Sequence, residues 1–249
     1  MIYNVNGEAV ENAKTIRNEN VKAFHTYDDN VIYHNDISAN TFSVLGDSYS
    51  TYDGYTNVGD RSGYTTWYPA NNQSFTDVSQ TWWKLLESET DLSLLDIDAY
   101  SGTCICYDGY GDGTKDQGRR GVSFIQRAEM VGYAEYIFVF GGTNDSTVNV
   151  QTGNYIYSGW TELDKEFFRP ACAYLLHELK KIYPLSKIVF IKNTGLKDGI
   201  ATSIDAICEH YSVPVVELQN IEKQNGHPTR TGMVQIATQV KAFLDTQES

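Results

Sequence analysis

The chain of 249 residues carries 19 basic and 32 acidic side chains, which gives a formal net charge of −13, and 41% of its residues are hydrophobic. This length and apolar content are enough for one domain with a sizeable core. The negative charge repels phosphate backbones and anionic lipid surfaces, so it argues against nucleic acid or a membrane surface as a partner.

Short runs rich in β-branched and aromatic residues predict five strands, at 41–45, 94–100, 136–140, 187–191 and 213–218. Most of these runs are apolar almost throughout, which is typical of strands buried on both faces of a parallel sheet. Apolar residues at helical spacing predict helices at 82–86, 168–182 and 233–244. Residues 1–40 show neither the helical nor the strand periodicity of apolar residues. We expect them to form an N-terminal extension, β-rich or irregular, packed on a main domain at 41–249.

The alternation of strands and helices predicts the fold class. Parallel strands joined by helices imply right-handed crossovers and a sheet covered on both faces. We therefore expect an α/β fold, a three-layer α/β/α sandwich around a flavodoxin-like parallel five-stranded sheet. In such a sheet ligands bind beyond the carboxyl ends of the strands, so the residues that follow each strand are the candidates for a site.

Four residues at these strand ends carry the groups that acyl transfer requires. Ser48 follows the first predicted strand, Gly102 the second and Asn144 the third, and His227 comes nine residues after the fifth. A serine attacks a carbonyl only when a base takes its proton, and a neutral imidazole is a fitting base. The main-chain amides of Ser48 and Gly102 and the side-chain amide of Asn144 would form the oxyanion hole. Alone, Ser48 or Asn144 would be an ordinary turn residue, but the four together favour the catalytic interpretation.

In this order the motifs resemble those of the SGNH, or GDSL-type, hydrolase superfamily, over roughly residues 41 to 245. The matching blocks are Gly46-Asp47-Ser48, Gly102, Gly142-Thr143-Asn144-Asp145, and His227-Pro228 followed by Gly232-Met233. Tyr49 stands where the leucine of the GDSL label would be. Several stretches also look like a bacterial subgroup of candidate acylhydrolases, a description that conveys no substrate.

The resemblance implies a serine esterase or acylhydrolase that forms an acyl-enzyme on Ser48, with His227 as base and with Gly102 and Asn144 in the oxyanion hole. The family frequently has an aspartate three residues before the histidine, and Gln224 occupies that position. A main-chain carbonyl, Glu222 or Asn225 could orient His227 instead, or the enzyme could work as a Ser-His dyad. The alternative function is a catalytically impaired carbohydrate-binding protein on the same fold.

The expected substrate is a small carboxylic ester, for which an O-acetyl group on a carbohydrate is one candidate. Aromatic residues in the loop at 49–80, and Tyr107, Tyr110 and Arg119-Arg120 in the loop at 103–121, could line the entrance to the site or simply pack the loops. No cofactor is expected. No metal is expected either, because the four cysteines lack zinc-finger spacing and Asp108, Asp112 and Asp116 do not make an EF-hand pattern.

The sequence also bears on where the protein is expected to act. No apolar run approaches the roughly 20 residues that span a bilayer. The first residues lack the basic and apolar regions of a signal peptide, so the chain as written is expected to be cytoplasmic, or secreted if a leader has been removed. The oligomeric state is left open.

Overall fold

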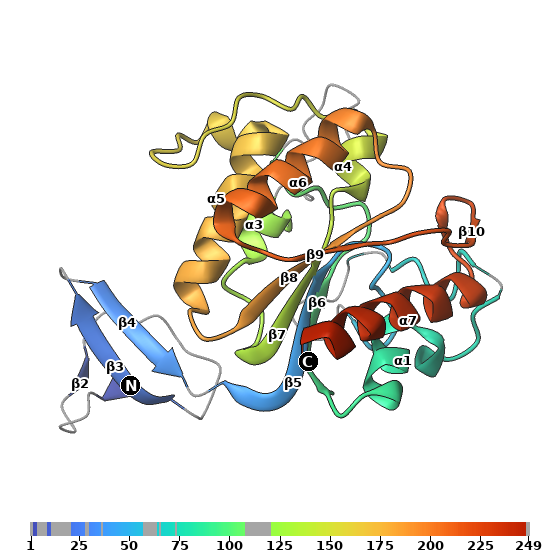
Figure 1. Cartoon of the computed structure of the whole chain (residues 1–249), viewed down its shortest axis with the longest axis horizontal. Coiled ribbons are helices and arrows are strands. Elements are labelled where there is room, and N and C mark those ends of the chain that lie inside the picture. The colour runs from blue at the N-terminus through green and yellow to red at the C-terminus, as the bar shows by residue number, and fades with distance from the viewer. Residues whose placement is uncertain are drawn as a thin grey trace.

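The computed structural model describes residues 37–56, 64, 66–72, 74–107 and 121–247 in full, and the backbone of four N-terminal strands. These strands are β1 (Ile2–Tyr3), β2 (Ala9–Val10), β3 (Val21–Tyr27) and β4 (Asn30–Asn35). β1 pairs with β2 and β3 pairs with β4, both antiparallel, and neither pair belongs to the central sheet. The N-terminal region thus contains β structure, drawn in blue in Figure 1.

A parallel five-stranded sheet forms the centre of the molecule (Figure 1). Its strands are β5 (Ser38–Gly46), β6 (Ser93–Ala99), β7 (Ala134–Phe140), β8 (Lys187–Lys192) and β9 (Val215–Glu217), arranged in the order β6-β5-β7-β8-β9. All four neighbouring pairs are parallel. This is the flavodoxin-like order, and the predicted fold class is confirmed.

Helices cover both faces of the sheet (Figure 1). α1 (Trp82–Glu89) and α7 (Arg230–Gln247) lie on one face, and α3 (Phe124–Arg127), α5 (Phe168–Ile182) and α6 (Asp198–Tyr211) lie on the other. The short elements are η2 (Val78–Gln80), α4 (Thr143–Thr147) and η3 (Asp164–Glu166). Three of these helices, α1, α5 and α7, were predicted, and α6 was not. Within the described residues, none of the helices has the length and apolar content needed to cross a membrane.

The strands alternate their side chains between two separate cores. In β7, Ile137 and Val139 pack with the helices α3, α5 and α6, whereas Phe138 and Phe140 pack with α1 and α7. All four side chains are fully buried. Such two-sided burial explains why the strands appear in the sequence as continuous apolar runs rather than as alternating patterns.

Candidate active site

The first element of the site is the turn that carries Ser48. Gly46, the last residue of β5, lies beside Ala99 at the end of β6 and Phe140 at the end of β7. The chain then turns tightly, with the amide of Ser50 donating to the carbonyl of Asp47 at 3.0 Å. A Cβ at position 46 would approach Ser50 Cβ to 2.7 Å, so only glycine fits there. The turn therefore places Ser48 at the carboxyl edge of the sheet, as predicted.

His227 lies within hydrogen-bond distance of this serine. The Nε2 atom of His227 is 2.7 Å from Ser48 Oγ, although the two residues are 179 positions apart in the chain. The Ser48 side chain is almost fully buried, with 4% of its surface exposed. A proton can pass directly between these two atoms.

His227 is carried by a two-stranded antiparallel hairpin, here called the histidine hairpin. It consists of β10 (Lys223–Gln224), the turn residues Asn225 and Gly226, and β11 (His227–Pro228). Both turn residues have positive φ angles, +52° and +77°. This conformation favours Asn-Gly in two-residue hairpin turns, because both central residues of such a turn need the left-handed region.

The second nitrogen of the imidazole is oriented by main chain. Nδ1 lies 3.3 Å from the carbonyl oxygen of Asn225, in the turn of the same hairpin. The carboxylate of Glu222 bonds to the hydroxyl of Thr229 instead, and Gln224 lies exposed across the hairpin from His227. Among the orienting groups that the sequence left open, the geometry therefore favours a main-chain carbonyl.

The environment keeps His227 neutral. Burial lowers the pKa of the imidazole to about 4, and the positive charge of Lys223 on the same hairpin acts in the same direction. The hydrogen bond to the carbonyl of Asn225 opposes this shift but does not outweigh it. Above about pH 5 the ring is thus in the form that accepts a proton.

The two predicted oxyanion residues lie at the neighbouring strand ends. Gly102 is in the turn after β6 with a φ of +74°, and Thr51 Oγ1 lies 3.3 Å from Ser101 Oγ, which joins this turn to the Ser48 turn. Asn144 lies in α4, directly after β7. Its Nδ2 donates to the carbonyl of Thr103 at 2.9 Å and lies 3.3 Å from Asp47 Oδ2. The structure thus brings Asn144 beside the residue that precedes Ser48.

Two buried carboxyl groups lie next to the predicted catalytic residues. Burial raises the pKa of Asp47 to about 7, although its Oδ1 accepts the amide of Tyr49 at 3.0 Å. Burial likewise raises the pKa of Asp145 to about 6, against hydrogen bonds from the amides of Ile105 and Cys106. Asp145 therefore holds the loop that follows Gly102, whereas Asp47 links the Ser48 turn to Asn144.

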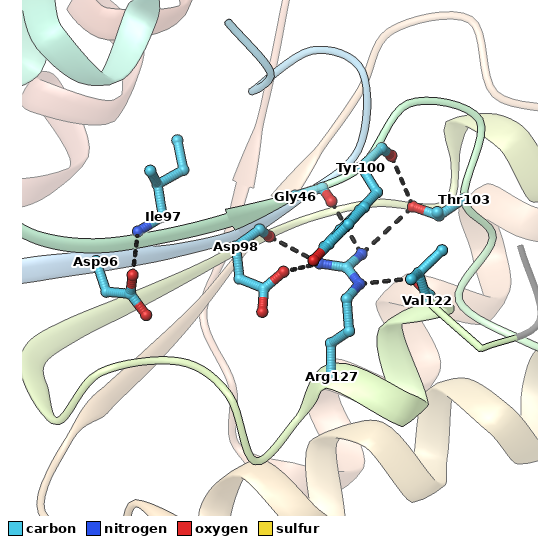
Figure 2. Close-up of polar contacts among 8 residues, drawn as sticks. All are labelled: Gly46, Asp96, Ile97, Asp98, Tyr100, Thr103, Val122 and Arg127. Carbon is cyan, nitrogen blue, oxygen red and sulfur yellow. Dashed lines mark hydrogen bonds and ion pairs between the residues drawn. The ribbon is translucent and has the colours of Figure 1, made fainter. Parts of the chain in front are cut away.

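A buried arginine joins the ends of β5 and β6 (Figure 2). Arg127 is 1% exposed and forms an ion pair with Asp98 at 2.9 Å. Its second terminal nitrogen donates to the carbonyl of Gly46 at 3.0 Å and lies 3.3 Å from Thr103 Oγ1. Burial lowers the pKa of Arg127, while Asp98 acts to raise it. Arg127 thus binds the main chain two residues before Ser48 and the side chain of the residue after Gly102. Nothing in the sequence pattern had singled it out.

Side chains from the loop after Ser48 hold the histidine hairpin. The hydroxyl of Tyr49 donates to the carbonyl of Gly226 at 2.6 Å, and Tyr68 Oη and Asn72 Nδ2 both donate to the carbonyl of Pro228 at 3.0 Å. The indole of Trp67 stacks on the imidazole of His227, with 3.5 Å between ring centroids and 11° between planes. The sequence showed the aromatic content of this loop but not these contacts.

The aromatic residues of the two predicted loops divide between packing and exposure. Tyr49, Tyr68, Phe75 and Tyr107 are buried, so for them the packing interpretation is correct. Tyr55 and Tyr64 are each 39% exposed, and Tyr64 contacts the ring of Tyr100 at 4.7 Å. Tyr110, the two arginines at 119 and 120, and the aspartates at 108, 112 and 116 lie outside the described residues. All four cysteines are buried, and Cys106 Sγ donates to Asp145 Oδ1 at 3.3 Å.

Comparisons with known proteins identify relatives of this chain. The sequence profile of the family described as GDSL-like lipase/acylhydrolase matches residues 40–244. The structure is similar to a candidate GDSL-like lipase from Bacteroides ovatus, with 39% identity and a TM-score of 0.77 over 83% of this chain and 98% of that chain. It is also similar to one from Bacteroides uniformis, with 37% identity and a TM-score of 0.76 over 83% and 96% of the two chains.

More distant structures share the fold. A family two carbohydrate esterase from Clostridium thermocellum, solved in complex with cellohexaose, is 15% identical with a TM-score of 0.53, and the match covers 88% of this chain and 67% of that chain. At this identity the likeness concerns the fold alone. The comparison with curated proteins gave no match.

Proposed function

The chain belongs to the GDSL-like lipase/acylhydrolase family of carboxylic ester hydrolases, and on this basis we propose that it cleaves small carboxylic esters through an acyl-enzyme on Ser48. The observation that carries the proposal is the 2.7 Å distance between Ser48 Oγ and His227 Nε2. A serine in hydrogen-bond contact with a neutral imidazole is the arrangement that nucleophilic acyl transfer requires.

Acylation follows from this pair. Ser48 Oγ attacks the carbonyl carbon of the ester while His227 Nε2 takes the hydroxyl proton. The tetrahedral intermediate then breaks its bond to the alkoxy oxygen, and the imidazolium returns the proton to that oxygen, so the alcohol leaves. In deacylation, water repeats the attack with His227 as base, and the carboxylic acid leaves as Ser48 regains its proton from the imidazolium.

The oxyanion would be held beside Asn144 and the amides of Ser48 and Gly102. Asn144 Nδ2 already donates to the carbonyl of Thr103, and its other contact, with Asp47 Oδ2, is longer at 3.3 Å. We propose that the oxyanion takes the hydrogen that faces Asp47, because an ionic acceptor at closer range outcompetes a long hydrogen bond. Losing one such donor typically lowers the rate about 100-fold or more.

Carbohydrate O-acetyl groups are the substrate class we favour. Ser48 exposes little surface, which suits a small acyl group. Tyr64 is exposed and lies against Tyr100, two residues before Gly102, so it could stack on a sugar ring at this edge of the sheet. A matched comparison of acetylated oligosaccharides with longer p-nitrophenyl acyl esters would rank the two classes by kcat/KM.

The proposal is tested by covalent labelling of the nucleophile. A fluorophosphonate probe should add to the peptide that contains Ser48, as detected by mass spectrometry, because the Ser48–His227 pair activates the hydroxyl. Ser146, a buried serine in α4, serves as an internal control and should stay unmodified. Sugar binding without any labelling of Ser48 would overturn the proposal in favour of the catalytically impaired carbohydrate-binding protein.

The pH dependence of kcat/KM should show its acid limb near pH 4. A base works only when neutral, and burial lowers the pKa of His227 to about 4, so activity should be level at pH 5 and fall as the pH drops through 4. Gln224→Glu would place a carboxylate across the hairpin, favour the imidazolium and move the limb to higher pH.

The titration of other groups near this site can be distinguished from that of His227. Lys223 lies on the hairpin, the hydroxyls of Tyr49 and Tyr68 donate to it, and Asp47, whose pKa is raised to about 7, lies in the Ser48 turn. Any inflection between about pH 6 and 7 that Gln224→Glu leaves in place would belong to Asp47 or to Asp145, the two buried carboxyl groups with raised pKa values. A wild-type acid limb near pH 6.5 would contradict the lowered pKa of His227, and a limb that moves down in Gln224→Glu would contradict the assignment to His227.

A further inference from the structure

Among the described residues, the histidine of this site has no acidic partner of the kind that usually steadies its positive charge. Nδ1 makes a long contact with the carbonyl of Asn225, and among the described residues no carboxylate hydrogen bond to the ring is present. The imidazolium that forms during acyl transfer therefore needs stabilisation from another source.

The indole of Trp67 lies where such stabilisation could come from. Its ring is parallel to the imidazole within 11°, at a centroid distance of 3.5 Å. A cation over the face of tryptophan is attracted by the negative face of the ring, and tryptophan is the strongest aromatic partner for this interaction. The attraction acts on the imidazolium and not on the neutral imidazole, so it favours the charged intermediate over the resting state.

The position of Trp67 is fixed relative to the nucleophile. Its main-chain amide donates to Thr51 Oγ1 at 3.1 Å, and that hydroxyl donates to the carbonyl of Ser48 at 3.1 Å. The indole, the nucleophile and the base are thus connected through three consecutive contacts. A ring held in this way also fixes the plane of the imidazole, so that Nε2 points at Ser48 Oγ.

The unpartnered N–H of the indole is an independent indication that Trp67 has a functional role. Trp67 Nε1 is buried and has no hydrogen-bond partner among the described residues. A buried donor without a partner is destabilising, and a phenyl ring would avoid that loss. The N–H therefore gives tryptophan no advantage over phenylalanine at this position, whereas the electron-rich face of the indole gives it one through His227.

We propose that Trp67 is a positioning residue that replaces the missing carboxylate by stacking on His227 and stabilising its imidazolium. The inference rests on the proposed esterase reaction. Tyr49, which stands where the GDSL label has leucine, supports the same arrangement because its hydroxyl holds the hairpin turn at Gly226.

Substitutions of Trp67 should distinguish a role in stabilising the imidazolium from a purely structural role. Trp67→Leu should lower kcat for p-nitrophenyl acetate roughly 10- to 30-fold with a smaller change in KM, and Trp67→Phe should lower it only a few-fold. Trp67→Phe should also be as stable to urea as the wild type, or more stable, since it removes an unpartnered N–H. Trp160→Phe, which alters a tryptophan beside His177 on another surface, is the matched control and should leave kcat unchanged.

Fluorinated tryptophan gives a test that does not depend on a variant folding. The chain has four tryptophans, and fluorination weakens the ring face without changing its burial. Global incorporation of mono- and trifluorotryptophan should lower kcat stepwise in the wild type, and the pKa of His227 read from its ring protons by NMR should fall in the same order. The Trp67→Phe protein keeps the other three tryptophans and should show neither trend.

The outcomes distinguish this inference from the proposed function. If the wild-type protein turns over esters, but neither its kcat nor the pKa of His227 changes on fluorination, the role of Trp67 alone is overturned. Absence of turnover and of Ser48 labelling would overturn the esterase proposal, while the NMR titration would still decide whether Trp67 stabilises the imidazolium.

Discussion

Ser48→Ala is expected to lower kcat/KM for p-nitrophenyl acetate by roughly 10⁴-fold or more, because loss of the nucleophile closes the acyl-enzyme route. His227→Ala should lower it by a similar factor. The double variant should be no worse than either single variant, since two groups that pass one proton act as a unit. Steady-state rates of the three purified proteins, with folding checked by thermal unfolding, measure this directly.

A second buried serine provides the control for this experiment. Ser123 is 1% exposed, and its hydroxyl has no hydrogen-bond partner among the described residues. Ser123→Ala therefore removes the same atom from a buried site without touching the proposed chemistry, and both activity and stability should be retained. A folded Ser48→Ala protein with undiminished turnover would contradict the assigned nucleophile.

Arg127→Met is expected to lower the free energy of unfolding by roughly 3–5 kcal/mol, because it breaks the buried ion pair with Asp98 by removing one of its two members. The same change removes the hydrogen bond to the carbonyl of Gly46 that fixes the start of the Ser48 turn. We therefore expect a fall in kcat as well, beyond what partial unfolding explains. Urea denaturation at pH 7 and kcat measured well below the unfolding transition report the two effects separately.

A double variant distinguishes stabilisation from positioning. Arg127→Met with Asp98→Leu replaces the whole buried ion pair by apolar side chains, which is often neutral for stability. The protein should regain much of its stability but not its kcat, because the donor to Gly46 is still missing. Lys187→Met breaks an exposed pair with Glu135 and should change stability by only about 0–1 kcal/mol. Recovery of kcat in the double variant would show that Arg127 acts only through the ion pair.

The sheet could be predicted because its strands are buried on both sides. Runs such as 136–140 are apolar at every position, and only a strand between two helical layers needs that pattern. The candidate site followed from the same fact, since the carboxyl ends of parallel strands share one edge and the polar residues after them must meet there. The contact of Ser48 with His227 is the geometric consequence of this topology.

The surroundings of His227 could not be predicted in the same way. Trp67 and Tyr49 lie 160 and 178 positions before the histidine (227 − 67 and 227 − 49), and their contacts depend on how a long irregular loop packs. The spacing of apolar residues along the sequence does not predict such a contact. The exception is Asn225-Gly226, a dipeptide that is itself a strong hairpin signal and that predicts the turn without any knowledge of the sheet.

That turn limits how this region of the chain can change in length. In an antiparallel pair, successive side chains point to opposite faces, so a shift of one residue in register moves each side chain to the other face. One residue inserted between Gln224 and His227 would direct the imidazole away from Ser48 even if every side chain were kept. Substitutions of the residues beside His227 in the histidine hairpin alter the strength of the base, whereas insertions and deletions decide whether the imidazole reaches Ser48 at all.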